Sequence, residues 1–140
     1  MKKSSTPNYE NWPRQKVKIA DLFLDSQNIR LQIEVKSSQG ALINDLFFNE
    51  HAMDVLESIA MHGFFPDEVP VVIEEDKKFV VIDGNRRVAA LKVLARPEIV
   101  PLNEVSVKRI LKVYSSVPRQ VEVVVAPNRE SVQNFLALRL

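Results

Sequence analysis

The sequence predicts an α+β domain in which several helices pack on a mixed β-sheet. Short apolar runs rich in β-branched residues, typical of buried strands, alternate along the chain with segments whose apolar residues recur at helical spacing. The 140 residues are 46% hydrophobic, which is enough for one domain with a core of its own. The chain has three glycines, and each lies at a junction between predicted elements, which supports this division.

The same patterns place the elements along the chain. Residues 1–15 are polar and contain two prolines, so we expect a flexible arm, followed by one domain over residues 16–140. Strands are expected within Lys16–Leu24, in a hairpin of Val69–Ile73 and Phe79–Ile82, and over Arg119–Ala126. Helices are expected from Gly40 to a break at Asn49, from there to Gly63, from the turn after Ile82 to about Ala95, and after caps at Asn103 and Asn128. The last helix has no C-cap signal, so we expect the chain to be part of a longer protein.

The composition excludes several classes of function. The formal net charge is +1, so binding to nucleic acid or to a membrane surface would need a local patch of charge. Without cysteine the chain has no disulfide, no thiolate metal site and no cysteine nucleophile, and its two histidines have no second ligand at metal spacing. No apolar run approaches the roughly 18 residues of a membrane span, and no apolar signal segment follows the lysines at positions 2 and 3. We therefore expect a cytoplasmic protein that has no contact with a membrane and no metal site built from cysteine or histidine.

The segment from Val80 to Leu94 carries the strongest functional signal. Its first residues are apolar and β-branched, whereas its second half is rich in Ala and Leu, which are good helix formers. The sequence Asp-Gly-Asn-Arg-Arg between them is expected to be a tight turn from a strand into a helix. Gly84 tolerates a positive φ and allows close approach of another group, and the first N–H groups of the helix point outward. Arg86 and Arg87 beside such a helix start suit an anion with several oxygens, above all a phosphate.

A purely structural interpretation of this turn stays open. Asp83 or Asn85 is then an ordinary helix cap, and Arg86 and Arg87 lie on a solvated face. A capping box needs Glu or Gln three residues after the cap, whereas Arg86 stands three residues after Asp83, which modestly favours a ligand. Asp83 has two interpretations of its own: it orients one of the arginines, which we prefer, or it holds Mg²⁺ or a water molecule as a catalytic group.

A second group of basic residues lies on the outward face of the helix that Asn103 caps. It consists of Lys108, Arg109 and Lys112. A solvated helix face is the favoured interpretation, and weak contact with the phosphate backbone of DNA is the alternative.

The order of these motifs resembles the N-terminal domain of ParB chromosome-partitioning proteins, which has the ParB/sulfiredoxin-like fold. The resemblance covers roughly residues 16–140. It rests on a strand with Leu22, an Asn28-Ile29-Arg30 loop, a helix with Leu56-Glu57-Ser58-Ile59 that ends at Gly63-Phe64, a proline-bounded hairpin, and the run from Ile82 to Lys92. The Gly-Asn-Arg-Arg version of the turn is similar to a branch of ParB-like proteins described as nucleases.

The resemblance implies a binding site for a nucleotide. In ParB proteins a Gly-x-Arg-Arg turn binds the triphosphate of CTP, and the matching residues here are Gly84–Arg87. A second ParB motif, with Asn and Arg in the loop after the first strand, corresponds to Asn28 and Arg30. A third motif, Glu-Asn in the last helix, helps to hold Mg²⁺, and Leu138–Leu140 at the aligned place lack that pair. Sulfiredoxin chemistry needs a cysteine and is excluded.

Three classes of function remain after this comparison. The first is a module that binds the triphosphate of an NTP (CTP or ATP) with Mg²⁺ at the turn and acts as a switch or NTPase. The second is a nuclease in which the same turn holds a DNA phosphate, and the third is a non-catalytic adaptor. Either kind of enzyme usually needs two or more convergent acidic groups, and Asp83 is the one identified. We place nucleotide or phosphate binding first, expect DNA to be bound through regions outside this chain, and leave self-association open.

Overall fold

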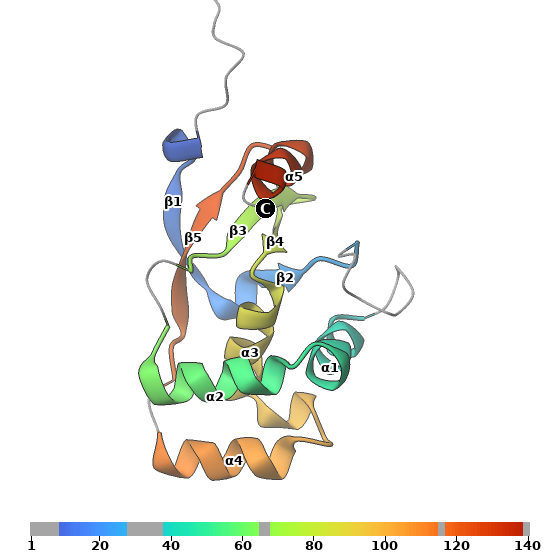
Figure 1. Ribbon diagram of the computed structural model, residues 1–140, viewed down its shortest axis with the longest axis vertical. Helices are drawn as coiled ribbons and strands as arrows, with labels where there is room; N and C mark the ends of the chain where they lie inside the picture. Colours follow the sequence, from blue (N-terminus) through green and yellow to red (C-terminus); the bar gives the residue numbers. More distant parts are fainter. Residues whose placement is uncertain (1–8, 28–37, 65–67, 115–116, 139–140) are drawn as a thin grey trace, which may run out of the picture.

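We describe the protein from a computed structural model that places residues 9–27, 38–64, 68–114 and 117–138. Over these residues a five-stranded sheet is combined with five α-helices, so the predicted α+β class is confirmed (Figure 1). The strands are β1 (Arg14–Lys18), β2 (Leu22–Leu24), β3 (Val71–Glu75), β4 (Lys78–Asp83) and β5 (Gln120–Val125). The α-helices are α1 (Gln39–Asn49), α2 (Ala52–His62), α3 (Asn85–Ala95), α4 (Glu104–Val113) and α5 (Arg129–Leu138), joined by the short 3₁₀ helices η1 (Tyr9–Asn11), η2 (Ile19–Asp21) and η3 (Pro97–Ile99). Within the described ranges no helix has the length and apolar character needed to cross a membrane.

The sheet is mixed and has the strand order β1-β5-β3-β4-β2. β1 pairs antiparallel with β5, and β3 with β4, whereas the β3–β5 and β2–β4 pairs are parallel. The predicted hairpin and the predicted strand over Arg119–Ala126 therefore share one sheet, because β3 lies between β4 and β5. The hairpin turns at Asp76 and Lys77, whose φ angles of 51° and 65° are typical of a primed turn that matches the twist of its strands.

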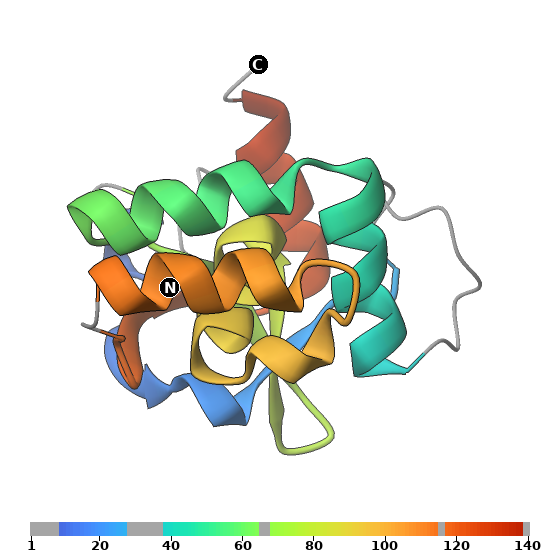
Figure 2. The same cartoon turned by 90° about the horizontal axis from the view of Figure 1, so that it is seen from below.

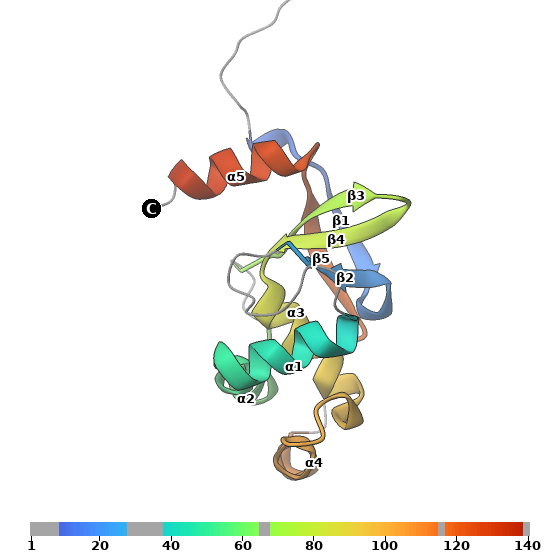
Figure 3. The same cartoon turned by 90° about the vertical axis from the view of Figure 1, so that its right-hand side faces the viewer.

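The helices α1 to α4 lie on one side of the sheet, and α5 lies on the other (Figure 3). At the centre of the larger core is α3, in which Val88–Leu91 is fully buried. Seen from the α4 end, α2 and α4 run side by side, and α1 is set across them (Figure 2). The smaller core joins Val132 of α5 to Val71 and Ile73 of β3. Because α3 is packed on all sides, the turn that precedes it starts from a fixed position.

The N-terminal part of the fold differs from the expected flexible arm. β1 begins at Arg14, and the rings of Tyr9 and Trp12 both contact the ring of Phe135 in α5, with centroid separations of 5.0 and 5.8 Å. Prolines and polar residues predicted an arm up to residue 15, but the two aromatic rings cover α5 and bring this segment into the smaller core. Residues 9–15 therefore pack on the domain, where a flexible arm was predicted.

The central position of α3 can be tested by truncating one of its leucines. Leu91 is fully buried, so Leu91→Ala is expected to lower the free energy of unfolding by about 2–5 kcal/mol through lost burial and a residual cavity. The matched control is Leu102→Ala, because Leu102 is 87% exposed and its loss should change stability by less than about 0.5 kcal/mol. Denaturant unfolding followed by circular dichroism measures both, and equal effects would contradict the position of α3.

Candidate anion-binding site

The turn between β4 and α3 is built around Gly84. Gly84 is the N-cap residue of α3 with φ 99°, in the left-handed region that favours glycine. A Cβ atom here would lie 3.0 Å from Nη2 of Arg87 and 3.3 Å from Pro70, so the position has no room for a side chain. The cap residue is Gly84 itself, not Asp83 or Asn85, and because glycine has no side chain it makes no side-chain capping bond. The positive end of the α3 dipole therefore lies at this turn.

The side chain of Asn85 faces inward. It is 4% exposed; its Nδ2 donates to the carbonyl of Val81 at 2.9 Å, and its Oδ1 accepts from the backbone N–H of Asp25 at 3.0 Å. This amide therefore ties the end of β2 to β4 and to the first turn of α3. The sequence placed Asn85 among the phosphate-binding residues, but in this arrangement both ends of its side-chain amide are used by Val81 and Asp25.

Arg86 and Arg87 point toward different parts of the molecule. The Nη1 of Arg86 donates to the backbone carbonyl of Glu50, just after α1, at 3.2 Å. The Nη1 of Arg87 lies 3.9 Å from a carboxylate oxygen of Glu68, and its side chain is 23% exposed. The Nε of Arg87 is buried and has no hydrogen-bond partner among the described residues. A buried donor without an acceptor costs about 1–3 kcal/mol, so Arg87 gains most from a ligand oxygen.

The sequence did not predict the ion pair between Arg129 and the buried Asp25, which is linked to the turn by the contact of Asp25 with Asn85. Nη1 of Arg129 is 2.8 Å from Oδ2 of Asp25, whose side chain is 5% exposed, and Nη2 of Arg129 is 3.4 Å from Glu75. Burial alone would lower the pKa of Arg129, but the hydrogen bonds to Asp25 and Glu75 and their negative charges outweigh burial and raise that pKa. One signal was present in the sequence: a cation in the first turn of a helix opposes the helix dipole, and Arg129 directly follows the Asn128 cap.

The end of β2 and the start of α1 are hydrogen-bonded to each other close to this turn. The side chain of Gln39, at the start of α1, accepts from the N–H of Leu24 at 2.7 Å and donates to its carbonyl at 3.1 Å. The next residue, Asp25, is held by Asn85. The chain therefore leaves the sheet at the first turn of α3. Asn28 and Arg30, the other predicted phosphate ligands, lie outside the described residues.

The carboxylates do not form a metal site within the described ranges. Asp83 is half-buried at the end of β4, where it pairs with Val71 of β3. No group of three or more His, Asp or Glu side chains gathers closely enough in this part of the chain to hold a metal ion. If Mg²⁺ accompanies a ligand here, most of its oxygen ligands have to come from the ligand and from water.

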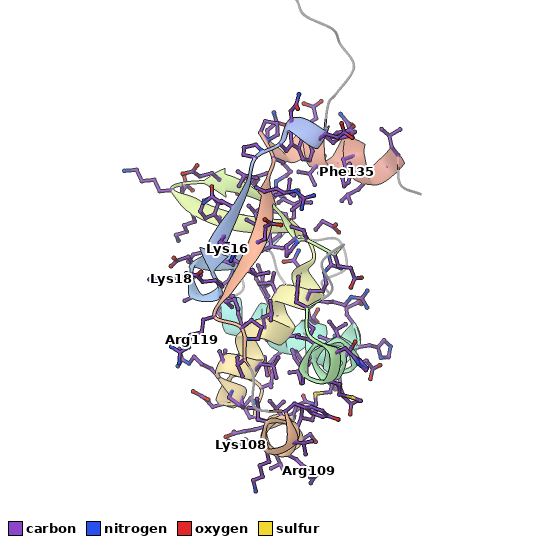
Figure 4. The ribbon with its side chains drawn as sticks, turned by 90° about the vertical axis from the view of Figure 1, so that its left-hand side faces the viewer. Lys16, Lys18, Lys108, Arg109, Arg119 and Phe135 are labelled. Carbon is purple, nitrogen blue, oxygen red and sulfur yellow. The ribbon has the colours of Figure 1, made fainter. Side chains whose placement is uncertain are left out.

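The predicted basic stripe on α4 lies apart from the turn. Figure 4 places Lys108 and Arg109 at the α4 end of the molecule, with Lys16, Lys18 and Arg119 along the same side. Lys108 is paired with Glu104 at 2.7 Å, one helical turn away, and this hydrogen bond raises the pKa of Lys108. Lys112 is exposed on the same helix. These side chains belong to a solvated surface that does not contribute to the site around Gly84.

Comparison with known proteins supports the fold. No protein-family model matches the chain, and a comparison with curated protein sequences gives no match either. Among solved structures, the chain is similar to the C-terminally truncated chromosome-partitioning protein ParB from Caulobacter crescentus, complexed with CTP-γ-S. The TM-score is 0.52 at 12% sequence identity, and the match covers 90% of this chain and 51% of that chain. The chain thus spans about half the length of that ParB and shares its fold, as the order of motifs in the sequence implied.

Proposed function

We propose that this domain binds the triphosphate of a nucleoside triphosphate at the turn formed by Asp83–Arg87. The observation that carries the proposal is the buried Nε of Arg87, which has no acceptor among the described residues and lies in the first turn of a helix whose cap residue is glycine. A phosphate group at this position would supply oxygen acceptors to Arg87 and to the N–H groups of α3 together. The similarity to a ParB structure complexed with a CTP analogue supports a nucleotide as the source of the phosphate.

Each residue of the turn has a separate role in this proposal. Gly84 adopts the positive φ of the turn and lets the guanidinium of Arg87 lie close to the backbone, and the side chain of Asn85 fixes the turn. Arg87 binds the phosphate directly, whereas Arg86 has to leave the carbonyl of Glu50 to do so. Asn28 and Arg30, which lie outside the described residues, are proposed as further phosphate ligands. Asp83 orients the arginines, or meets a Mg²⁺ ion that the phosphates carry.

Nucleotide binding is preferred over the nuclease alternative on chemical grounds. A nuclease that used this turn would need a second acidic group near Asp83 to activate water, and no metal-binding cluster exists in the described part of the chain. Phosphate binding needs only the helix start and the arginines. Hydrolysis of the nucleotide, CTP or ATP, comes second in the proposal, and contact with DNA is assigned to other regions of a longer protein.

Removal of the Arg87 guanidinium is expected to weaken nucleotide binding. Arg87→Ala should cost about 1.5–3 kcal/mol of binding free energy, the scale of a hydrogen bond to a charged group. Arg86→Ala should cost less, because Arg86 already has a carbonyl partner. Calorimetry with CTP, ATP and GTP in Mg²⁺ measures both, and Lys112→Ala serves as the control. Unchanged affinity in both arginine variants, with native circular dichroism, would show that the pair is a solvated face.

Glu68 is expected to compete with the ligand for Arg87. Its carboxylate lies 3.9 Å from Nη1 of Arg87, so Glu68→Gln removes a negative charge from the site and should tighten triphosphate binding. The Glu68 side chain is 53% exposed, and solvent screening limits the gain to less than about 1 kcal/mol. The control is Glu122→Gln, which removes an equally exposed carboxylate paired with Arg14 on the outer strands. Weaker binding by the Glu68 variant would argue against phosphate contact with Arg87.

Residues 1–140 are expected to hydrolyse NTPs weakly, if at all, and to bind DNA only feebly and without sequence preference. The net charge of +1 supplies little electrostatic attraction, and Lys108 in the basic stripe is already paired. Hydrolysis should be slow because no group of three or more possible metal ligands gathers at the turn within the described residues. Gel-shift titration at two salt concentrations and a phosphate-release assay measure these properties. Tight, sequence-selective binding or rapid turnover would contradict the expectation.

A further inference from the structure

Asp25 makes three contacts at the point where β2 ends. Its backbone N–H donates to Oδ1 of Asn85 at 3.0 Å, and its own Oδ1 accepts from the N–H of Gln27 at 3.0 Å. Its Oδ2 accepts from Nη1 of Arg129 at 2.8 Å. A carboxylate has an acceptor oxygen for each of the last two donors, whereas an Asn side chain has only one oxygen. The Asp25 side chain therefore orders residues 25–27 and joins them to α5, while its backbone joins them to α3.

The charge of Asp25 creates a difficulty for an anion site. The carboxylate is buried, and its backbone contacts the first residue of α3, where the phosphate is proposed to bind. A buried negative charge next to a bound anion is repulsive and is poorly screened by solvent. The guanidinium of Arg129 lies directly against this carboxylate and cancels its charge. Glu75 engages the other end of the guanidinium at a longer distance and is 43% exposed, so it offsets less of the Arg129 charge.

We propose that Asp25 and Arg129 are positioning residues of the anion site. The backbone N–H of Asp25 holds the end of β2 against the first turn of α3, and its carboxylate orders residues 25–27. Arg129 neutralises that carboxylate, so that the site can accept a phosphate. Neither side chain contacts the ligand. This inference rests on the proposed function, because it assigns these residues a role in the same site. It adds that the negative charge of Asp25 has to be neutralised before an anion can bind.

Neutralisation of Asp25 by Arg129 can be tested by two substitutions whose effects on ligand affinity should cancel. Arg129→Gln leaves the buried carboxylate uncompensated, and we expect affinity for CTP and for inorganic triphosphate to fall about tenfold, the scale for unit charges roughly 10 Å apart at an effective dielectric constant of about 20. Adding Asp25→Asn removes the repelling charge and keeps an oxygen for the Gln27 N–H, so the double variant should recover most of the lost affinity. Arg129→Lys keeps the positive charge and should bind more tightly than Arg129→Gln.

The control is Arg14→Gln, which breaks an exposed ion pair with Glu122 on the outer strands and should leave affinity unchanged. Thermal unfolding and circular dichroism accompany each titration, so that affinity is compared only among folded variants. Recovered affinity in the double variant supports the inference even if its thermal midpoint stays low. Both Arg129→Gln and the double variant lack the ion pair, so a purely structural role of the pair would leave both equally weak. A double variant as weak as Arg129→Gln, or wild-type affinity in Arg129→Gln, overturns it. If the wild-type protein binds neither CTP nor triphosphate, the proposed function fails, and this inference fails with it.

Discussion

The buried amide of Asn85 is the interaction on which the arrangement of the turn depends. Its two hydrogen bonds, to Val81 and to Asp25, join β4, the end of β2 and the first residue of α3. A shorter or apolar side chain would leave a buried carbonyl and a buried N–H without partners, each at a cost of about 1–3 kcal/mol. The amide supplies one donor and one acceptor on a short stem, which is what the two backbone groups require. Gly84, which has no Cβ, adopts its positive φ of 99° between these fixed residues.

The elements of the fold were largely predictable because each is specified by local patterns. The helical spacing of buried side chains located α3 and its neighbours, and the alternating apolar residues of β5 located that strand. The cap at Asn128 is present as predicted, with its Oδ1 accepting from the N–H of Ser131 at 2.8 Å. Pairing between distant strands carries no such local signal, and neither the parallel β2–β4 pair nor the order of the sheet was predicted.

The turn that carries the candidate site was predictable in position, but the contacts of its side chains were not. Gly84 and the two arginines follow an apolar strand, and that pattern alone located the turn. The inward orientation of Asn85 depends on Asp25, which is 60 residues away in the chain, and the Arg129 contact spans 104 residues. Contacts at such separations leave no periodic trace in one sequence. The divergence of Arg86 and Arg87 likewise follows from Glu50 and Glu68, whose positions only the folded chain brings to the turn.

In the proposed site, a ligand with several phosphate groups would have an advantage over a monoanion. Arg87 faces Glu68, so a monoanion that displaces this carboxylate exchanges one weak ion pair for another and gains little. A triphosphate carries enough oxygens to occupy the N–H groups of α3 and the buried Nε of Arg87 at the same time. Each additional phosphate adds attraction without adding a new carboxylate to displace. The neutralisation of Asp25 by Arg129 acts in the same direction, because repulsion from a buried carboxylate would grow with the charge of the ligand.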